Sequence, residues 1–251
     1  MDSIQKLVDN YNGPLLHKWD NYPEIYDYYF SKYRGTEVVF LEIGISHGGS
    51  LQFWREYFGE KAHIYAIDVN PKCKQFETER TKIFIGSQED PIFLEELKRQ
   101  LPLLDLLLDD GGHTMKQQIV TFSHLFNHVK NDGIYICEDT HTSYMKVYGG
   151  NLKKKSTFVE FCKNHIDNLH SWFMPEKHKN KQLTNITTDV WGIHFYNSMV
   201  VYLKKKTKQP IAIVKGYKTV DTEENYLTYG APRPFYKNIT DFIFRRKRKK
   251  V

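Results

Sequence analysis

The sequence predicts an α/β protein, a Rossmann-like doubly wound sheet of about seven strands with a helical N-terminal appendage. Short apolar runs of strand length alternate with amphipathic stretches along most of the chain, a pattern that is typical of βαβ units. Glycines follow the first apolar run, and acidic residues follow the second, fourth and fifth. Ligands of open α/β sheets bind beyond the carboxyl ends of the strands, so this distribution favours a ligand-binding enzyme.

The expected elements follow in chain order. Residues 1–34 form a helical segment, because aromatic and apolar side chains recur near helical spacing before Gly35, at Trp19, Tyr22, Ile25, Tyr26, Tyr29 and Phe30. Helices are also expected over 51–59, over 115–129 and after Thr157, which forms a possible capping box with Glu160. Strands are expected at 37–44, 62–69, 81–87, 103–110 and 133–139, and 191–205 should form two strands joined by a tight Asn-Ser turn.

The composition is that of a globular protein. A chain of 251 residues with 40% hydrophobic content can bury a sizeable core, which excludes global disorder. No apolar run approaches the ~20 residues that span a bilayer, and the first residues lack a secretory pattern. The three cysteines are isolated in the sequence, as expected in a reducing compartment. These features predict a cytoplasmic protein.

The net charge of +6 is concentrated at the C-terminus. The last eight residues, FRRKRKKV, hold six lysines and arginines, so the remainder is formally neutral by subtraction (6 − 6). Such a tail can bind nucleic acid or an anionic membrane surface, or it can be a solvated end. Nucleic acid is not expected as a partner, because a basic tail leaves the acidic motifs unexplained. Peripheral membrane contact through the tail stays open.

The first candidate site is the turn LEIGISHGGS, residues 41–50. Its glycines let a ligand approach the backbone, and the following helix N-terminus favours an anionic group. Asp68 ends the second strand, where a carboxylate can bind ribose hydroxyls, and the segment GSQED places Gln88, Glu89 and Asp90 after the third. These features predict a nucleoside cofactor. An ordinary βαβ unit with closely packed glycines is the alternative, and the spacing is not that of GxGxxG.

Glu42 interrupts the first apolar strand. A buried carboxylate without a partner is costly. We therefore expect Glu42 to accept hydrogen bonds from backbone amides or from an amine of the cofactor.

The second candidate site is acidic. Asp109, Asp110 and His113 follow strand four, and Glu138 and Asp139 follow strand five. Neighbouring strands would bring these carboxylates together, where like charges repel unless they are protonated or bridged by a cation. Oxygen ligands suit Mg²⁺, Mn²⁺ or Ca²⁺, and a single histidine argues against iron. His113 can be a general base, a ligand or a structural cap.

Several stretches together resemble the class I S-adenosylmethionine-dependent methyltransferases, and within them the mycinamicin methyltransferase-like, metal-dependent sugar O-methyltransferases. The resemblance runs from about Trp19 to Lys206 and includes HKWDNYPEIYDYYF, FLEIGISHGGS, GSQED, LLLDDGGH, CEDTHTSY and HFYNSMVVYLKK. It implies two cofactors, S-adenosylmethionine and Mg²⁺.

The resemblance also implies roles for individual residues. Asp110, Glu138 and Asp139 would hold Mg²⁺, and His113, with Asp110, would be catalytic, His113 as the general base. Asp68 would bind the ribose, with Glu42 and Gly44 against the methionine end. The cofactor-binding set is completed by Ser50, Gln88 and Asp109. The expected substrate contacts are His47, His141, Tyr144 and His194.

We therefore expect three parts: a helical lid or interface segment at 1–35, a methyltransferase domain at 36–206, and a C-terminal extension with a basic tail at 207–251. The expected reaction is Mg²⁺-dependent methylation of a sugar hydroxyl, on a nucleotide-linked sugar or glycan precursor of bacterial surface polysaccharide. The alternatives are a catechol or another small metabolite as acceptor, or a non-enzymatic binder of nucleic acid or membrane. The aromatic N-terminal segment suggests a homo-oligomer.

Overall fold

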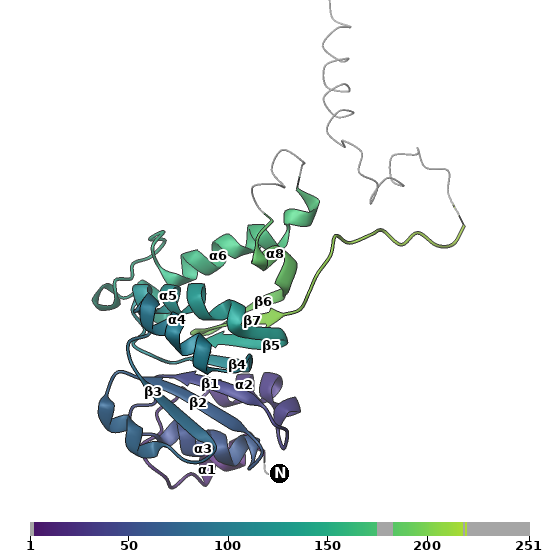
Figure 1. The fold of residues 1–251 in the computed structure, drawn as a ribbon. Coiled ribbons are helices and arrows are strands. Elements are labelled where there is room, and N and C mark those ends of the chain that lie inside the picture. Colours follow the sequence, from purple (N-terminus) through teal and green to yellow (C-terminus); the bar gives the residue numbers. More distant parts are fainter. Residues whose placement is uncertain (1–2, 175–182, 218, 220–251) are drawn as a thin grey trace, which may run out of the picture.

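A seven-stranded sheet forms the centre of the computed structural model, which describes residues 3–174, 183–217 and 219. The strand order is β3-β2-β1-β4-β5-β7-β6 (Figure 1). Strands β1 to β5 are parallel, and β7 runs antiparallel to both of its neighbours. This arrangement confirms the predicted fold class. The strands are β1 (Val39–Ile43), β2 (His63–Asp68), β3 (Thr81–Ile85), β4 (Leu104–Asp109), β5 (Val129–Cys137), β6 (Val190–Tyr196) and β7 (Met199–Lys204).

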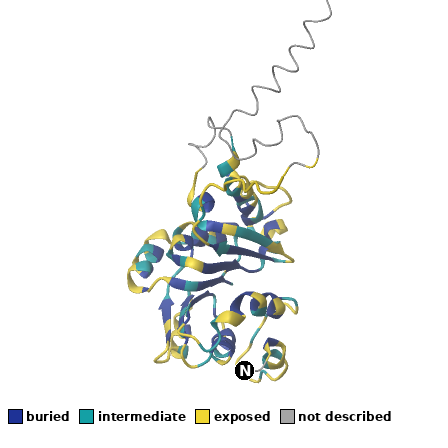
Figure 2. Ribbon diagram, turned by 90° about the vertical axis from the view of Figure 1, so that its right-hand side faces the viewer, coloured by how far each residue is buried: buried dark blue, intermediate teal, exposed yellow. Residues whose placement is uncertain are grey.

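Helices cover both faces of the sheet and bury its central strands (Figure 2). One face carries α1 (Ile4–Asp9), α2 (Tyr22–Phe30) and α3 (Gly49–Phe58), and the other carries α4 (Pro91–Gln100), α5 (Met115–Leu125) and α6 (Phe158–Leu169). Side chains of a strand alternate between the faces. Phe40 therefore packs in the core under α3, on the same side as Glu42, while Leu41 and Ile43 belong to the opposite core.

The N-terminal segment differs from the prediction of one helical stretch over 1–34. Residues 10–21 between α1 and α2 are not helical, and Gly13 and Pro14 lie in this break, where proline restricts the residue before it and removes a backbone donor. Trp19, expected on the helical face, is half exposed outside any helix. Helix α2 itself belongs to the core under α3: the rings of Tyr26 and Phe30 lie 5.1 and 5.7 Å from that of Trp54.

Most other predicted elements are present, with differences at their ends. The fifth strand, predicted over 133–139, runs from Val129 to Cys137. The helix predicted over 115–129 ends at Leu125, because a short 3₁₀ turn leads directly into β5 at Val129. Thr157 accepts the backbone N–H of Glu160 at 3.4 Å, but the Glu160 carboxylate pairs with Lys163, so only half of the expected capping box forms. The tight turn between the last two strands is at 197–198, as predicted.

The remaining elements are short. They are η1 (Ser31–Tyr33), η2 (Pro71–Phe76), η3 (Phe126–His128), η4 (Thr140–Tyr144), η5 (Lys146–Tyr148), η6 (Ser171–Phe173) and α8 (Asn185–Asp189). Within the described ranges, no helix has the length and apolar character needed to cross a bilayer. The basic tail and most of the predicted extension 207–251 lie outside the described residues.

Candidate active site

A cavity of about 470 Å³ lies at the carboxyl ends of the central strands. Its walls come from the turn after β1, the end of β2, the loops after β3, β4 and β5, and the non-helical residues 15–19. The two predicted sites therefore share one cavity. Of the predicted cofactor, metal and catalytic residues, those that line it are Gly44, Ser50, Asp68, Gln88, Asp110, His113, Glu138 and Asp139.

The glycine turn packs directly on the tip of β4. Gly44 has φ +85°, and a Cβ atom there would lie 2.2 Å from the backbone oxygen of Asp110. Only glycine permits both this conformation and this approach. Asp68 braces the same turn, because its Oδ2 accepts the N–H groups of Ile45 and Ser46, both at 3.0 Å. The turn and the end of β2 thus form one rigid wall of the cavity.

Glu42 is fully buried behind this wall and does not line the cavity. It accepts hydrogen bonds from Ser50 Oγ at 2.7 Å and Trp54 Nε1 at 3.0 Å. Its partners are thus side chains rather than the backbone amides that were one expectation, and the other expectation, a contact with an amine of the cofactor, stays a prediction. Burial raises the pKa of the Glu42 carboxyl to about 7.

Gln88 and Asp109 form a buried pair that supports the loop after β4. Gln88 donates from Nε2 to Asp109 at 2.8 Å and to Thr121 Oγ1 at 3.0 Å, and its Oε1 accepts the Gly112 N–H at 2.8 Å. Burial raises the pKa of Asp109 to about 7. Gln88 reaches the cavity, whereas Asp109 does not line it. Their contacts with a cofactor stay predictions.

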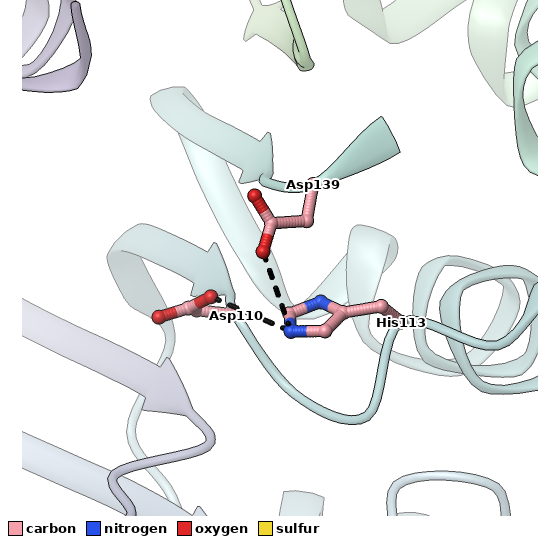
Figure 3. Close-up of side chains that lie close together, drawn as sticks. All are labelled: Asp110, His113 and Asp139. Atoms are coloured by element: carbon pink, nitrogen blue, oxygen red, sulfur yellow. Dashed lines mark ion pairs between the residues drawn. The ribbon is translucent and has the colours of Figure 1, made fainter. Parts of the chain in front are cut away.

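His113 lies between two carboxylates (Figure 3). Its Nε2 is 3.9 Å from Asp110 Oδ1 and 3.5 Å from Asp139 Oδ2. The three side chains come from the loops after β4 and β5, and one potential ligand atom of each lies within 4.8 Å of the others. His113 and Asp139 both have positive φ, +58° and +52°, an uncommon backbone conformation that is frequent at functional sites.

This cluster fits a hard divalent cation. Two carboxylates supply oxygen donors of the kind that Mg²⁺ prefers, with room for water or substrate oxygens. His113 Nδ1 is buried and has no hydrogen-bond partner among the described residues, so the ring is not anchored by a second bond in the way that a structural histidine is. The chemical nature of these donor atoms, rather than any single distance, supports a site for a divalent cation.

Glu138, the third predicted metal ligand, has different partners. It is buried and accepts a hydrogen bond from the Tyr26 hydroxyl. Its Oε2 also forms an ion pair with Lys18 Nζ at 3.1 Å. Lys18 Nζ also lies 2.6 Å from Asp110 Oδ2 and 3.8 Å from Glu42 Oε1. Burial and the nearby Asp110 carboxylate raise the pKa of Glu138 well above its ordinary value.

Lys18 carries the positive charge in this arrangement. Burial alone would lower the pKa of its ammonium, but the surrounding carboxylates outweigh that effect and raise the pKa above its ordinary value. Beside it, Trp19 Nε1 donates to Asp139 Oδ1 at 3.0 Å, and the Tyr22 hydroxyl donates to the same oxygen at 2.7 Å. Oδ2 of Asp139 remains directed at His113.

Sequence reasoning missed Lys18, Tyr22 and Tyr26 as parts of the site. One signal was present: a cluster of four or five carboxylates needs positive charge nearby, and the HKWD lead-in places a lysine beside a tryptophan. Spacing alone could not connect that lysine to loops about 90 and 120 residues further on.

The predicted substrate contacts are only partly brought together. His141 Nδ1 lies 4.0 Å from Asp139 Oδ1. None of the four predicted residues, His47, His141, Tyr144 and His194, lines the cavity. His194 instead lies on β6 with its Nδ1 2.5 Å from the Tyr29 hydroxyl. The roles of all four in substrate binding stay predictions.

Sequence comparisons place the chain beside curated O-methyltransferases, although no family model matches it. It is 31% identical over 206 residues to demethylmacrocin O-methyltransferase of Streptomyces fradiae, covering 78% of this chain and 51% of that protein. It is 30% identical over 212 residues to mycinamicin VI 2''-O-methyltransferase of Micromonospora griseorubida, covering 80% and 52%. The chain thus spans about half the length of the curated relatives it matches.

Solved structures agree with the sequence comparison. The MycE methyltransferase of the mycinamycin biosynthetic pathway, in complex with Mg and SAH, superposes with a TM-score of 0.74 at 27% identity over 82% of this chain and 55% of that one. A second crystal form of that complex gives 0.76 at 25% identity, over 96% and 59%.

The chain has the fold of the class I S-adenosylmethionine-dependent methyltransferases. Within that class the chain resembles the metal-dependent sugar O-methyltransferases, as the relatives and the MycE complexes show. Both parts of the resemblance drawn from the sequence are confirmed.

Proposed function

We propose that this chain transfers a methyl group from S-adenosylmethionine to a hydroxyl of a sugar-bearing small molecule, with Mg²⁺ as cofactor. The observation that carries the proposal is the single cavity in which the glycine turn and Asp68 face Asp110, His113 and Asp139. Relatives with this reaction type and solved MycE complexes with Mg and SAH support it.

In the proposed mechanism, Asp110, Glu138 and Asp139 would hold the cation, and His113 Nε2 removes the hydroxyl proton. When bound, Mg²⁺ would acidify and orient the acceptor oxygen. As the proton moves to His113, the oxygen forms a bond to the methyl carbon and the carbon–sulfur bond breaks, its electron pair staying on sulfur. The products are a methyl ether and S-adenosylhomocysteine. Alignment in the cavity supplies much of the rate, since positioning can contribute ~7–11 kcal/mol.

Around the cofactor, we propose that Asp68 binds the ribose and that the turn at Gly44 lies against the methionine end. Asp68 lines the cavity, and its carboxylate accepts hydrogen bonds from the turn after β1. The same carboxylate can therefore position the ribose and the turn. Gln88 would contribute mainly by holding the loop after β4, because its amide is engaged by Asp109, Thr121 and Gly112.

The acceptor class is best sought among glycosides. The names of the curated relatives refer to macrocin, tetracenomycin, mycinamicin and oleandolide compounds. The narrower expectation of a nucleotide-linked sugar in surface polysaccharide synthesis finds no support in these relatives, so both acceptor classes belong in the test.

The test is to incubate the protein with labelled S-adenosylmethionine and a panel of glycosides and nucleotide sugars, with Mg²⁺ or with EDTA. We expect methyl transfer that EDTA abolishes and Mg²⁺ restores. His113→Ala should lower turnover by about 10²–10⁴-fold, as expected on loss of a general base, while His124→Ala, a surface residue paired with Glu95, should not. If methyl transfer is equally fast with EDTA, the proposed role of Mg²⁺ is wrong. If His113→Ala keeps full activity, His113 is not the general base.

A further inference from the structure

Two consecutive residues of one non-helical segment contact all three carboxylates that the resemblance assigns to Mg²⁺. Lys18 Nζ pairs with Asp110 and Glu138, and Trp19 Nε1 donates to Asp139. Both residues belong to the segment 15–19, which forms one wall of the cavity. The side chain of Lys18 is only 10% exposed, so its ammonium is enclosed within the acidic cluster.

The ammonium and a divalent ion need the same oxygens. Lys18 is hydrogen-bonded to Asp110 Oδ2 at 2.6 Å and to both oxygens of Glu138 at 3.1 and 3.2 Å. Mg²⁺ needs carboxylate oxygens at ~2.0–2.1 Å in octahedral geometry. A dication placed between Asp110 and Glu138 would also lie within a few ångströms of a positive charge in a partly dry site, where repulsion is strong.

We propose that Lys18 is an internal cation that competes with the divalent metal ion for Asp110 and Glu138, so that metal binding displaces the segment 15–19. The inference deepens the proposed function and rests on its metal site. When the metal is bound, Lys18 leaves both carboxylates. When it is not, the ammonium neutralises a carboxylate pair whose mutual repulsion would otherwise destabilise the loops after β4 and β5.

The contacts of the segment allow this exchange. In the described part of the chain, every hydrogen bond of Lys18 goes to Asp110 or Glu138. The segment is outside any helix, and the backbone oxygen of Trp19 accepts the Tyr22 N–H at 3.1 Å, so its displacement disturbs α2 only at the first turn of that helix. Tyr26 and Tyr22, in contrast, belong to α2 and keep their hydrogen bonds to Glu138 and Asp139 as Lys18 moves.

The first experiment measures Mn²⁺ affinity by electron paramagnetic resonance for the wild type, Lys18→Met and Lys116→Met. Lys116 is the matched control, because its side chain is 67% exposed and it lies 3.5 Å from Glu89. We expect Lys18→Met to bind Mn²⁺ at least about tenfold more tightly, because its competitor and a nearby positive charge are both removed. The Mn²⁺ affinity of Lys116→Met should stay within about twofold of that of the wild type. Unchanged or weaker binding by a folded Lys18→Met overturns the inference.

The second experiment uses the wild type and therefore does not depend on how well a variant folds. Acetylation of lysines is followed by mass spectrometry with and without saturating Mg²⁺. We expect Mg²⁺ to speed the labelling of Lys18 at least about fivefold, by releasing the ammonium from its partners, and to leave Lys116 unchanged. Lys18 that stays protected at saturating Mg²⁺ overturns the inference.

The metal site is tested separately with Asp139→Asn. If Mn²⁺ binds the wild type, is weakened by Asp139→Asn and leaves Lys18 protected, the competition is wrong and the proposed function stands. If Mn²⁺ binds neither the wild type nor Lys18→Met, both the competition and the metal-dependent mechanism fall.

Discussion

At the scale of single residues, charge and backbone conformation determine the site. Three carboxylates surround the ammonium of Lys18, and two of the residues nearest the proposed metal, His113 and Asp139, have positive φ. Such strained positions persist only where surrounding contacts hold them. Gly44 is constrained in both ways, by its positive φ and by its close approach to the loop that carries Asp110.

Gly44→Ala should therefore disrupt this junction. A methyl group would meet the Asp110 backbone oxygen at 2.2 Å, on a backbone with φ +85°. We expect a loss of more than about 2 kcal/mol in the free energy of unfolding, from positive-φ strain of ~1–2 kcal/mol plus the clash, measured in urea.

Gly216→Ala is the matched control. Gly216 has φ +96°, but no heavy atom lies within 4 Å of the position that a methyl group would take there. Only the conformational cost applies, and it applies in a segment without regular structure. If Gly44→Ala and Gly216→Ala both lower the free energy of unfolding by the same small amount, the turn after β1 can move away from β4 at little cost.

At the scale of elements, the sequence predicted which strands would meet. The apolar runs gave the strands, and the usual strand order of doubly wound sheets placed β4 beside β5. The structure pairs Asp109 with Cys137 in parallel register. The boundary of α5 was harder to predict, because apolar residues at 126 and 129 continue the helical spacing although the chain has already turned into β5.

Helix α6 is joined to β7 by a buried histidine. His165 Nδ1 pairs with the Tyr202 hydroxyl at 2.8 Å, and its ring stacks on Phe122 at 5.2 Å. Burial lowers the pKa of His165 to about 4 from an ordinary 6.5. The folded state therefore favours the neutral ring, whereas the unfolded chain binds a proton below pH ~6.5.

This difference predicts a pH dependence of stability. The contribution of neutral His165 is fully present above pH ~6.5 and is lost as the pH falls through the window from ~6.5 to about 4. We expect His165→Gln to flatten the fall in unfolding free energy across that window by about 2 kcal/mol, a figure reduced for partial solvent screening. Urea unfolding at several pH values measures it. If the unfolding free energies of the wild type and His165→Gln fall in parallel with pH, His165 is not the source of the pH dependence.

At the scale of the whole molecule, the N-terminal segment is where the sequence was least informative. Its aromatic spacing correctly indicated α2, but local spacing could not show that Gly13 and Pro14 separate two helices. Nor could it show that the residues between them reach the acidic loops. Lys18 contacts Asp110 and Glu138 across 92 and 120 positions, and such contacts depend on the tertiary arrangement rather than on periodicity.

The core under α3 includes residues of α1 and α2 as well as of the sheet. Phe30 is fully buried, with its ring 6.1 Å from that of Phe40 on β1, whereas Tyr28, two positions earlier on the same helix, is 74% exposed. If α2 is an integral part of the fold, the two positions should respond very differently to truncation.

Phe30→Ala should lower the free energy of unfolding by about 3–5 kcal/mol, because it leaves a cavity beneath the aromatic cluster. Tyr28→Ala should change it by less than about 1 kcal/mol, since little apolar area is buried at that position. Thermal unfolding followed by near-ultraviolet circular dichroism measures both. Similar small effects would mean that α2 packs loosely on the sheet as a separable appendage, and the wall that carries Lys18 and Trp19 would then lack the rigid base that places it against Asp110 and Asp139.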